Sequence, residues 1–380
     1  MKLIFHSNAP WNSSGYGVEC ALFVPRIAAL GHEVTIAAPY SFSGTPLEWN
    51  GFTVLPCARD TAGNDVIIQN HEYFKADWTI TLSDPFGLAK AVKELRQINV
   101  AFWFPVDCNP LAKADATVLR ESRGTAIAMS RFGERVLQAE GAEPLYVPLA
   151  VDTKVFQPGD PHAYRDKLHG VTDETFVIGI CAMNRDPNRK GLHEQMIAFA
   201  GFHRMHPDSF LAIHSTPAST PGLNLTALAV QLGITDAVVF PDAYSYDMGL
   251  ITAEQMASWY SGLDLLSACS YGEGFGLPLI EAQACGIPVV TTDASSMSEL
   301  CGAGWLVSGT PFWSDGHQAW WKRPDIHDIG QAYEMAWQAK QDGKLTRVKS
   351  AYDFAQQYDA DRVFREYMIP VICELEERVT

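Results

Sequence analysis

Short apolar runs alternate with longer stretches of helical character along the whole chain. The runs that we predict as strands lie at 2–5, 34–37, 66–68, 100–104 and 126–128 in the first half, and at 176–181, 210–213, 238–240, 263–267 and 288–291 in the second. Continuous apolar strands separated by helices indicate parallel sheets covered on both faces. The alternation of strand and helix begins at 2–5 and begins again in the same way at 176–181. The sequence therefore predicts an α/β protein of two doubly wound, Rossmann-like domains that face each other across a cleft.

The boundary between the two predicted domains falls where proline and glycine interrupt the chain. Three prolines and a glycine lie between positions 148 and 161, and such residues mark loops and linkers. We therefore place the first domain at 1–152 and the second at 153–359. The last stretch, about 360–380, is predicted to be a helix that Pro370 kinks. Its apolar stripe needs a partner surface.

Composition and charge exclude several classes of protein. The chain has 380 residues, of which 47% are apolar and 19% are charged, so it is globular and not disordered. The 28 basic residues against 44 acidic ones give a net charge of −16. This charge disfavours broad contact with nucleic acid or anionic lipid, although a local basic pocket can still bind phosphate.

Nothing in the sequence indicates a membrane or secreted protein. No apolar run approaches the ~18 residues of a membrane span, and the N-terminus carries one lysine and a three-residue apolar run before His6, which is unlike a signal peptide. The eight cysteines show no CxxC spacing. We therefore expect reduced cysteines and a cytoplasmic location.

Aromatic residues make up 11% of the chain. The ten tryptophans of the chain exceed what a core needs and fit a cleft that grips flat polar rings. Trp305, Trp313, Trp320 and Trp321 lie close together in the sequence. They either pack in the interior or form an aromatic surface beside the cleft, and the sequence leaves both readings open.

The segment 271–282 is the richest in chemistry. Glycines at 272, 274 and 276 let backbone amides approach a ligand closely. Pro278 suits the first turn of a helix, whose N-terminus then points free N–H groups at an anion. Glu273 and Glu281, eight positions apart, can reach two hydroxyl-rich parts of one ligand. The alternative is an ordinary glycine loop with two surface glutamates.

This Glu-x7-Glu segment resembles the signature of retaining GT-B glycosyltransferases of the group-one (family four) class. Other motifs of that class follow in the same order over most of the chain, at 14–17, 147–158, 185–191, 240–242, 256–264 and 288–299. The fold resemblance also implies that the last helix crosses back to pack on the first domain.

The resemblance implies roles for individual residues. Glu273 would hold sugar hydroxyls of a donor and Glu281 its ribose hydroxyls, while Arg185 and Lys190 would pair with a diphosphate. The donor-binding residues that it implies are Gly15, Gly17, Gly274, Phe275, Gly276, Leu277 and Glu281. Taken without the resemblance, 184–190 reads as a charged surface loop and 14–17 as a flexible turn.

One feature of many relatives, a cleft histidine in the first half, is missing. The corresponding stretch 102–110 carries Asp107 and no histidine. Asp107 could orient the acceptor or the donor sugar as a catalytic residue, or it could form a turn before Asn109-Pro110. His71 is a second cleft candidate, for which a hydrogen-bonded loop histidine is the simpler description.

The resemblance implies a retaining transferase that moves a hexose from a UDP- or GDP-linked sugar to an acceptor hydroxyl. No metal site and no cofactor besides the donor is expected, and the acceptor is a saccharide, a protein or a small metabolite. A sugar-nucleotide epimerase and a non-catalytic nucleotide-sugar-binding protein of the same fold remain alternatives. A nicotinamide dehydrogenase is excluded because Cys20 stands where its third phosphate-binding glycine belongs.

Overall fold

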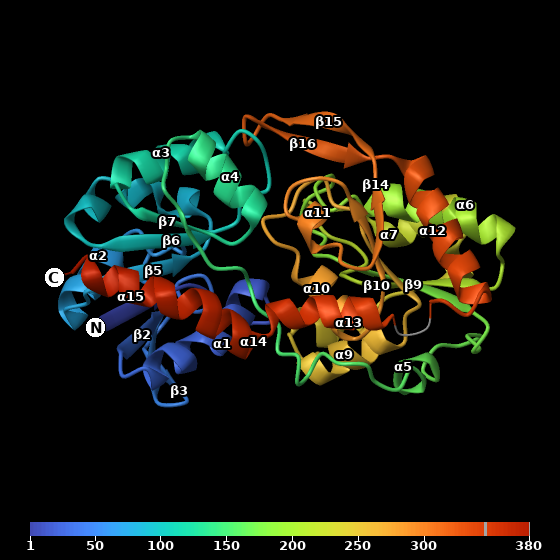
Figure 1. The fold of residues 1–380 in the computed structure, drawn as a ribbon, viewed down its shortest axis with the longest axis horizontal. Helices are drawn as coiled ribbons and strands as arrows, with labels where there is room; N and C mark the ends of the chain where they lie inside the picture. The colour runs from blue at the N-terminus through green and yellow to red at the C-terminus, as the bar shows by residue number, and fades with distance from the viewer. Residues whose placement is uncertain (346–347, 380) are drawn as a thin grey trace. The chain divides into compact units, whose positions relative to one another are not determined.

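Two parallel sheets, one in each half of the chain, form the framework of the computed structural model, which describes residues 1–345 and 348–379 (Figure 1). The chain divides into two compact units. Unit 1 comprises 1–150, 314–319 and 360–380, and unit 2 comprises 151–313 and 320–359. The predicted fold class, two doubly wound α/β domains, is confirmed.

The sheet of unit 1 has eight strands in the order β3-β4-β2-β1-β5-β6-β7-β8. Their bounds are β1 Lys2–His6, β2 Glu33–Ala37, β3 Leu47–Trp49, β4 Phe52–Leu55, β5 Trp78–Leu82, β6 Val100–Phe104, β7 Thr125–Ala128 and β8 Leu145–Tyr146. Every pairing is parallel except that of β3 with β4. The order reverses between β1 and β5, which makes this pair the switch point of the sheet.

Helices cover the sheet of unit 1. They are α1 Gly15–Ala29, α2 Ile67–Phe74, the 3₁₀ segments η1 Pro85–Ala91 and η2 Glu94–Gln97, α3 Lys113–Ser122 and α4 Arg131–Ala139. The strand that we predict at 66–68 is wrong, because Ile67 begins helix α2. The amides of Val66 and Ile67 donate to Gly63 O, which starts a helical turn. Ile67 is buried as part of that helical turn, so tertiary packing overrides the preference of this β-branched residue for a strand.

The sheet of unit 2 has six parallel strands in the order β11-β10-β9-β12-β13-β14. The strands are β9 Phe176–Cys181, β10 Ser209–His214, β11 Val238–Val239, β12 Leu265–Ala268, β13 Val289–Thr292 and β14 Gly304–Val307, and a separate hairpin is formed by β15 Gly309–Ser314 and β16 Ala319–Pro324. The switch point of this sheet lies between β9 and β12.

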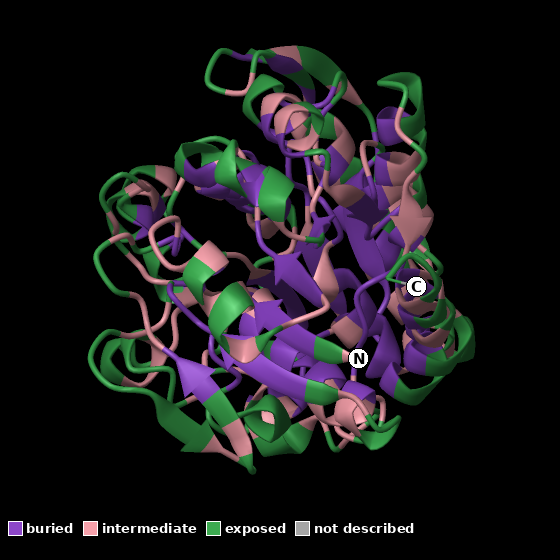
Figure 2. Ribbon diagram, turned by 90° about the vertical axis from the view of Figure 1, so that its left-hand side faces the viewer, coloured by how far each residue is buried: buried purple, intermediate pink, exposed green. Residues whose placement is uncertain are grey.

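The helices of unit 2 flank its sheet. They are α5 His162–Arg165, α6 Leu192–Met205, α7 Leu225–Leu232, η3 Thr235–Ala237, α8 Ala243–Asp247, α9 Ala253–Ser261, α10 Leu277–Ala284, α11 Met297–Leu300, α12 Ile326–Gln341, α13 Lys349–Ala355 and η4 Gln356–Tyr358. The purple strands and greener outer helix faces of Figure 2 show that the sheets are the buried layer.

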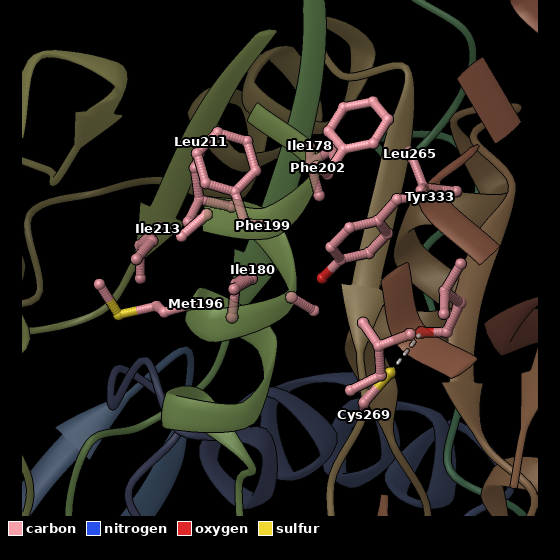
Figure 3. Packing of buried hydrophobic residues seen from close by; sticks show 14 of the residues in the cluster. Ile178, Ile180, Met196, Phe199, Phe202, Leu211, Ile213, Leu265, Cys269 and Tyr333 are labelled. Atoms are coloured by element: carbon pink, nitrogen blue, oxygen red, sulfur yellow. Dashed lines mark hydrogen bonds between the residues drawn. The ribbon is translucent and has the colours of Figure 1, made fainter. Parts of the chain in front are cut away.

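The core of unit 2 lies between its sheet and the helices α6 and α12. Figure 3 shows Phe199 and Phe202 of α6 beside the strand residues Ile178 and Leu211. Tyr333 of α12 is fully buried, and its hydroxyl donates to Ser267 Oγ at 2.7 Å. Such burial is worth about 1.5–3 kcal/mol for each large apolar side chain, so this core fixes the strand ends that carry the site.

The C-terminal stretch consists of α14 Ala360–Val363, the π-helical segment η5 Phe364–Met368 and α15 Ile369–Glu377. Its apolar stripe is buried within unit 1, as the burial of Val363, Met368 and Leu375 shows. Trp78 Nε1 of β5 donates to Leu375 O at 2.9 Å. The contacts of this stretch therefore tie the end of the chain to unit 1, although its sequence neighbours 320–359 belong to unit 2.

Candidate functional site

Two loops leave the carboxyl ends of β9 and β12 at the switch point of unit 2. Loop 182–191 leads from β9 into α6, and loop 269–276 leads from β12 into α10. β9 and β12 are directly hydrogen-bonded neighbours, so both loops start at the same edge of the sheet. Open α/β sheets bind their ligands at this position.

Close backbone contacts hold the two loops together. Gly191 has a positive φ of 56°, and a Cβ at this residue would lie 2.2 Å from Cys269 O, so only glycine fits. Next to it, Tyr271 N donates to Arg189 O at 2.7 Å. These contacts fix the end of loop 182–191 against the start of loop 269–276.

The buried side chain of Gln195 bridges the same two loops from inside α6. Its amide nitrogen donates to Lys190 O at 2.9 Å, and its amide oxygen accepts from Ser267 Oγ and from Cys269 N. We missed this residue in the sequence, where it reads as one polar position in an apolar helix. Its function is to position both loops.

Glu273 lies at the centre of a charge cluster. One carboxylate oxygen, Oε1, is 2.6 Å from Lys190 Nζ and accepts from Ser270 Oγ at 2.5 Å, while Oε2 is 3.4 Å from Arg189 Nη1. Burial by itself would raise the pKa of Glu273, but the charges of Lys190 and Arg189 lower it to about 2. The residue is therefore ionised and oriented at neutral pH, and the reading of Glu273 as a plain surface glutamate is wrong.

The two cations beside Glu273 are not the pair that we selected from the sequence. Arg189 and Lys190 contact its carboxylate, whereas Arg185 is exposed earlier in the same loop. Asn184, next to Arg185, is fully buried, and its side-chain amide nitrogen donates hydrogen bonds to Thr216 O and Leu223 O. Arg189 directly precedes Lys190 in the sequence, and this adjacency is the feature that could have identified Arg189 as a second cation of the site.

Glu281 lies in α10, one helical turn beyond Pro278. Its Oε2 accepts a hydrogen bond from the hydroxyl of the fully buried Tyr260 at 2.7 Å. Burial raises the pKa of Glu281 to about 7, and the Tyr260 hydrogen bond opposes that rise. Glu273 and Glu281 therefore differ in charge state at neutral pH, the first ionised and the second close to half protonated.

The segment between the two glutamates is fixed by serines after β13. Ser296 Oγ donates to Glu273 O at 2.7 Å and to Phe275 O at 2.5 Å, and Ser295 Oγ accepts from Glu273 N. Gly276 has a φ of 120°, which side chains rarely adopt, and it directly precedes α10. Among the described side chains none caps this helix start, so its first amides face the loop.

Gly15 and Gly17 lie in unit 1, at the start of α1 and after β1. Ser14 caps this helix by accepting from Gly17 N at 3.3 Å, so 14–17 is a helix start and the flexible-turn reading is wrong. A Cβ at Gly17 would lie 2.2 Å from Asn12 O. The packing of the preceding loop against position 17 therefore requires a glycine there, whether or not Gly17 contacts a ligand.

Asp107 follows β6 near the switch point of unit 1. With Asp84 and Asp115 it lines a small cavity of about 30 Å³. Asp115 is buried, accepts from Phe86 N at 2.8 Å, and has its pKa raised by burial to about 7. His71 lies in α2 and not in a loop, and its Nδ1 is 2.9 Å from Thr79 Oγ1.

The described residues form neither a metal-binding cluster nor a membrane-spanning helix. Among these residues, no group of three or more histidine, cysteine, aspartate or glutamate side chains is arranged to hold a metal ion. No helix in the described part of the chain is long and apolar enough to cross a membrane.

Sequence comparison places the loops of unit 2 in a known family. Residues 176–313 match the family described as "Glycosyl transferases group 1". The chain is 28% identical over 195 residues to a D-inositol 3-phosphate glycosyltransferase of Stackebrandtia nassauensis, covering 50% of this chain and 41% of that protein. It is 30% identical over 196 residues to the lipopolysaccharide core biosynthesis mannosyltransferase LpsB of Rhizobium meliloti, covering 49% and 52%. The matches thus span about half the length of these curated relatives or less.

Solved structures share the fold over the whole chain. A sucrose-phosphate synthase from Thermosynechococcus elongatus superposes with a TM-score of 0.77 at 16% identity, covering 100% of both chains. Anabaena Alr3699/HepE in complex with UDP gives a TM-score of 0.71 at 16% identity, covering 98% of this chain and 100% of that one. The resemblance stated from the sequence is confirmed over residues 176–313, which match the group 1 glycosyltransferases, and the whole chain has the GT-B fold.

Proposed function

We propose that the protein is a retaining glycosyltransferase that moves a hexose from a UDP- or GDP-linked sugar to an acceptor hydroxyl. The observation that carries the proposal is the cluster of Lys190, Arg189 and Glu273 at the switch point of unit 2. It combines cations for a diphosphate with an ionised carboxylate for sugar hydroxyls. The family membership of 176–313 and the UDP complex of the Anabaena neighbour support the same class of donor.

The cluster suits a diphosphate because it brings two cations to one edge of the sheet in a chain whose net charge is −16. Lys190 and Arg189 lie beside each other in the loop that follows β9, and both contact the Glu273 carboxylate. The starts of α6 and α10 add amide groups at the same edge of the sheet. Arg185, exposed in the same loop, is proposed to reach the outer phosphate.

Catalysis in this proposal is electrostatic. When the bond from the sugar to the diphosphate breaks, negative charge builds up on the leaving phosphate, and preorganised donors that face it lower the barrier. Lys190 is held for this purpose by Glu273 through its side chain and by Gln195 through its backbone. We infer that the leaving diphosphate itself receives the acceptor proton on the same face, which retains the configuration of the sugar.

Other residues complete the proposed donor site. Glu281 would accept hydrogen bonds from the ribose hydroxyls, and the amides of Gly274, Phe275, Gly276 and Leu277 would contact phosphate and sugar. In unit 1, Gly15 and Gly17 after β1 are proposed to contact the donor, and Asp107 after β6 is proposed to orient the acceptor or the donor sugar. The eight cysteines, all within the described residues, are free thiols, which supports the proposed cytoplasmic location.

A donor screen followed by product analysis tests the function. UDP- and GDP-linked glucose, galactose and mannose are first ranked by the rise in melting temperature that each produces. The best donor is then incubated with a panel of saccharide, peptide and metabolite acceptors, and NMR determines the anomeric configuration of the product. An α-linked product from an α-linked donor is expected. A β-linked product contradicts retention, binding without any transfer or hydrolysis supports the non-catalytic alternative, and an epimerised donor supports an epimerase.

Removal of divalent metal is expected to leave turnover unchanged. Lys190, Arg189 and two helix starts already meet the phosphate charge in this proposal. The measurement is the initial rate with EDTA, with magnesium and with manganese. If EDTA abolished turnover and either metal restored it, a metal and not the cationic cluster would be responsible for neutralising the diphosphate.

Nucleoside diphosphate affinity is expected to rise by about fivefold between pH 6 and pH 8 through Glu281. Its pKa of about 7 means that the carboxylate form, the stronger acceptor for ribose hydroxyls, gains population over this interval. Calorimetry on wild type and on Glu281→Gln separates this effect from titration of the nucleotide itself, since only the wild type contains the carboxyl group. Equal pH dependence in both proteins would contradict the ribose assignment.

The same raised pKa predicts the sign of a stability effect. Between pH 4.5 and about pH 7 the unfolded protein has lost the Glu281 proton while the folded protein still holds it. The free energy of unfolding therefore falls as pH rises through this interval. Glu281→Gln is expected to lack this contribution and to be relatively more stable at pH 8 than at pH 5.

A further inference from the structure

The hairpin of β15 and β16 has two different faces. On one face Phe312 and Trp321 lie parallel at 6.4 Å, and Phe312 also meets the ring of Tyr271 edge-on at 5.1 Å. On the other face Trp313 and Trp320 form a cross-strand pair with ring centroids 5.1 Å apart and planes at 65°. The first face is packed, whereas Trp313 and Trp320 are 44% and 48% exposed.

The packed face attaches the hairpin to the proposed donor site. Lys322 N donates to Tyr271 O at 3.0 Å, in the loop that carries Glu273. Arg323 Nε donates to the buried Glu194 carboxylate at 2.9 Å, and the same oxygen accepts from the Tyr271 hydroxyl at 2.5 Å. The exposed tryptophan pair is therefore held in a fixed position relative to the loop 269–276.

The exposed pair needs an explanation of its own. Single exposed apolar residues are ordinary, but here two indoles stand together on a strand pair whose opposite face already supplies the packing. An indole ring has a negative face, which attracts the weakly positive C–H groups on the flat side of a pyranose ring, and its N–H can bond a hydroxyl. A stacking surface of this kind selects for sugars over most other polar ligands.

Charge at the hairpin argues for a sugar and against a membrane surface. The two cations of β16 are both engaged within unit 2: Lys322 Nζ contacts Asp293 O at 2.5 Å, and Arg323 pairs with Glu194. The turn that joins the strands carries Asp315 and an uncharged Gln318, both exposed. Binding to anionic lipid needs available cations near the aromatic residues, and this hairpin has its cations paired.

We propose that Trp313 and Trp320 form a stacking platform for the pyranose rings of a saccharide acceptor. This inference rests on the proposed function, because it selects a saccharide from the acceptor classes that the sequence leaves open. Lys322 lies two residues beyond Trp320 in β16, so its side chain leaves the same face of the strand, and its Nζ donates to Asp293 O. Asp293 belongs to the segment after β13 whose serines hold the Glu273 backbone, so the tryptophan face is continuous with the proposed donor site. The platform would hold the acceptor chain while the donor site performs the transfer.

A glycan array tests the platform. Wild type, Trp313→Ala, Trp320→Ala and the double variant are applied to immobilised gluco-, manno- and galacto-oligosaccharides with α and β linkages. Each single substitution is expected to weaken binding by about tenfold, the size of one aromatic contact. Trp49→Ala is the matched control, because Trp49 and Phe52 form a cross-strand aromatic pair at the sheet edge of unit 1, and it should bind like wild type.

Conservative variants keep the test decisive if the alanine variants fold poorly. Trp320→Phe retains an aromatic face and should keep most of the binding, while Trp320→Leu retains apolar volume without that face and should lose it. Equal binding by these two variants overturns the stacking inference. So does a wild type that binds no glycan, or one that binds phosphatidylglycerol vesicles through Trp313 and Trp320.

A parallel titration separates this inference from the function on which it rests. Calorimetry with UDP and GDP measures the donor site alone. A wild type that binds nucleoside diphosphate but shows tryptophan-independent glycan binding disproves only the platform. A wild type that binds neither UDP nor GDP disproves the proposed function, whatever the array shows.

Discussion

Lys190→Ala is expected to lower kcat by about 10²-fold or more and to weaken nucleoside diphosphate binding, because one electrostatic donor to a leaving phosphate is worth ~3 kcal/mol. The lysine stands 2.6 Å from Glu273 in a partly buried pair, so its Nζ is held in place before any substrate arrives. Steady-state kinetics and calorimetry with the nucleoside diphosphate check the two parts. Arg185→Ala is expected to act in the same direction and more weakly, since Arg185 is exposed.

Lys340→Ala is the matched control for this experiment. Lys340 is also a partly buried lysine of unit 2 in an ion pair, 3.0 Å from Asp264, but Asp264 lies at the amino end of β12. Each substitution removes one of two cations from a partly buried carboxylate, since Arg165 still pairs with Asp264 and Arg189 with Glu273, and both should lower the melting temperature. Only Lys190→Ala should lower kcat. Normal nucleotide binding and turnover in Lys190→Ala would mean that 184–190 is a charged surface loop after all.

Glu273→Ala is expected to reduce transfer by about 10²-fold while nucleoside diphosphate affinity stays nearly intact. The carboxylate is assigned to the sugar and not to the diphosphate, and Lys190 keeps its backbone contact with Gln195 when Glu273 is removed. The measurements are turnover with the best donor and calorimetry with the nucleoside diphosphate. A large loss of nucleotide affinity would contradict the assignment to the sugar.

A carboxylate of unit 1, far from the donor loops in sequence, provides the control for Glu273. Glu134 pairs with Arg131 at 2.7 Å in α4, where Glu134 is partly buried and Arg131 is exposed, and pairs that water reaches contribute about 0–1 kcal/mol. Glu134→Gln should therefore leave both turnover and stability close to wild type. Loss of activity in this variant would show that the assay responds to general destabilisation.

Much of the fold could be predicted because its strands are continuous apolar runs. β9 and β6 have this character, and such strands are typical of a buried parallel sheet. β5 Trp78–Leu82, at the centre of the unit 1 sheet, was missed because Thr79 and Thr81 interrupt its apolar run, although both are fully buried. The helix that begins at Ile67 was predicted as a strand, because the strand propensity of β-branched residues does not depend on where the side chain packs in the folded protein.

The candidate site could be predicted in outline, because the loops that follow neighbouring parallel strands lie at the same edge of the sheet. Glu273 and Lys190 are 83 residues apart in sequence, and their meeting follows from the pairing of β9 with β12. The contribution of Arg189 and the bridge by Gln195 could not be predicted, since they depend on how loop 182–191 turns before Gly191. The roles of Gly15, Gly17 and Asp107 stay predictions.

The most direct test of the central claim is a crystal structure of the protein with a bound nucleoside diphosphate. We expect phosphate oxygens within hydrogen-bonding distance of Lys190 Nζ, at the carboxyl ends of β9 and β12, with the ribose hydroxyls at Glu281. A nucleotide bound elsewhere, without any contact to Lys190, would contradict the proposed donor site.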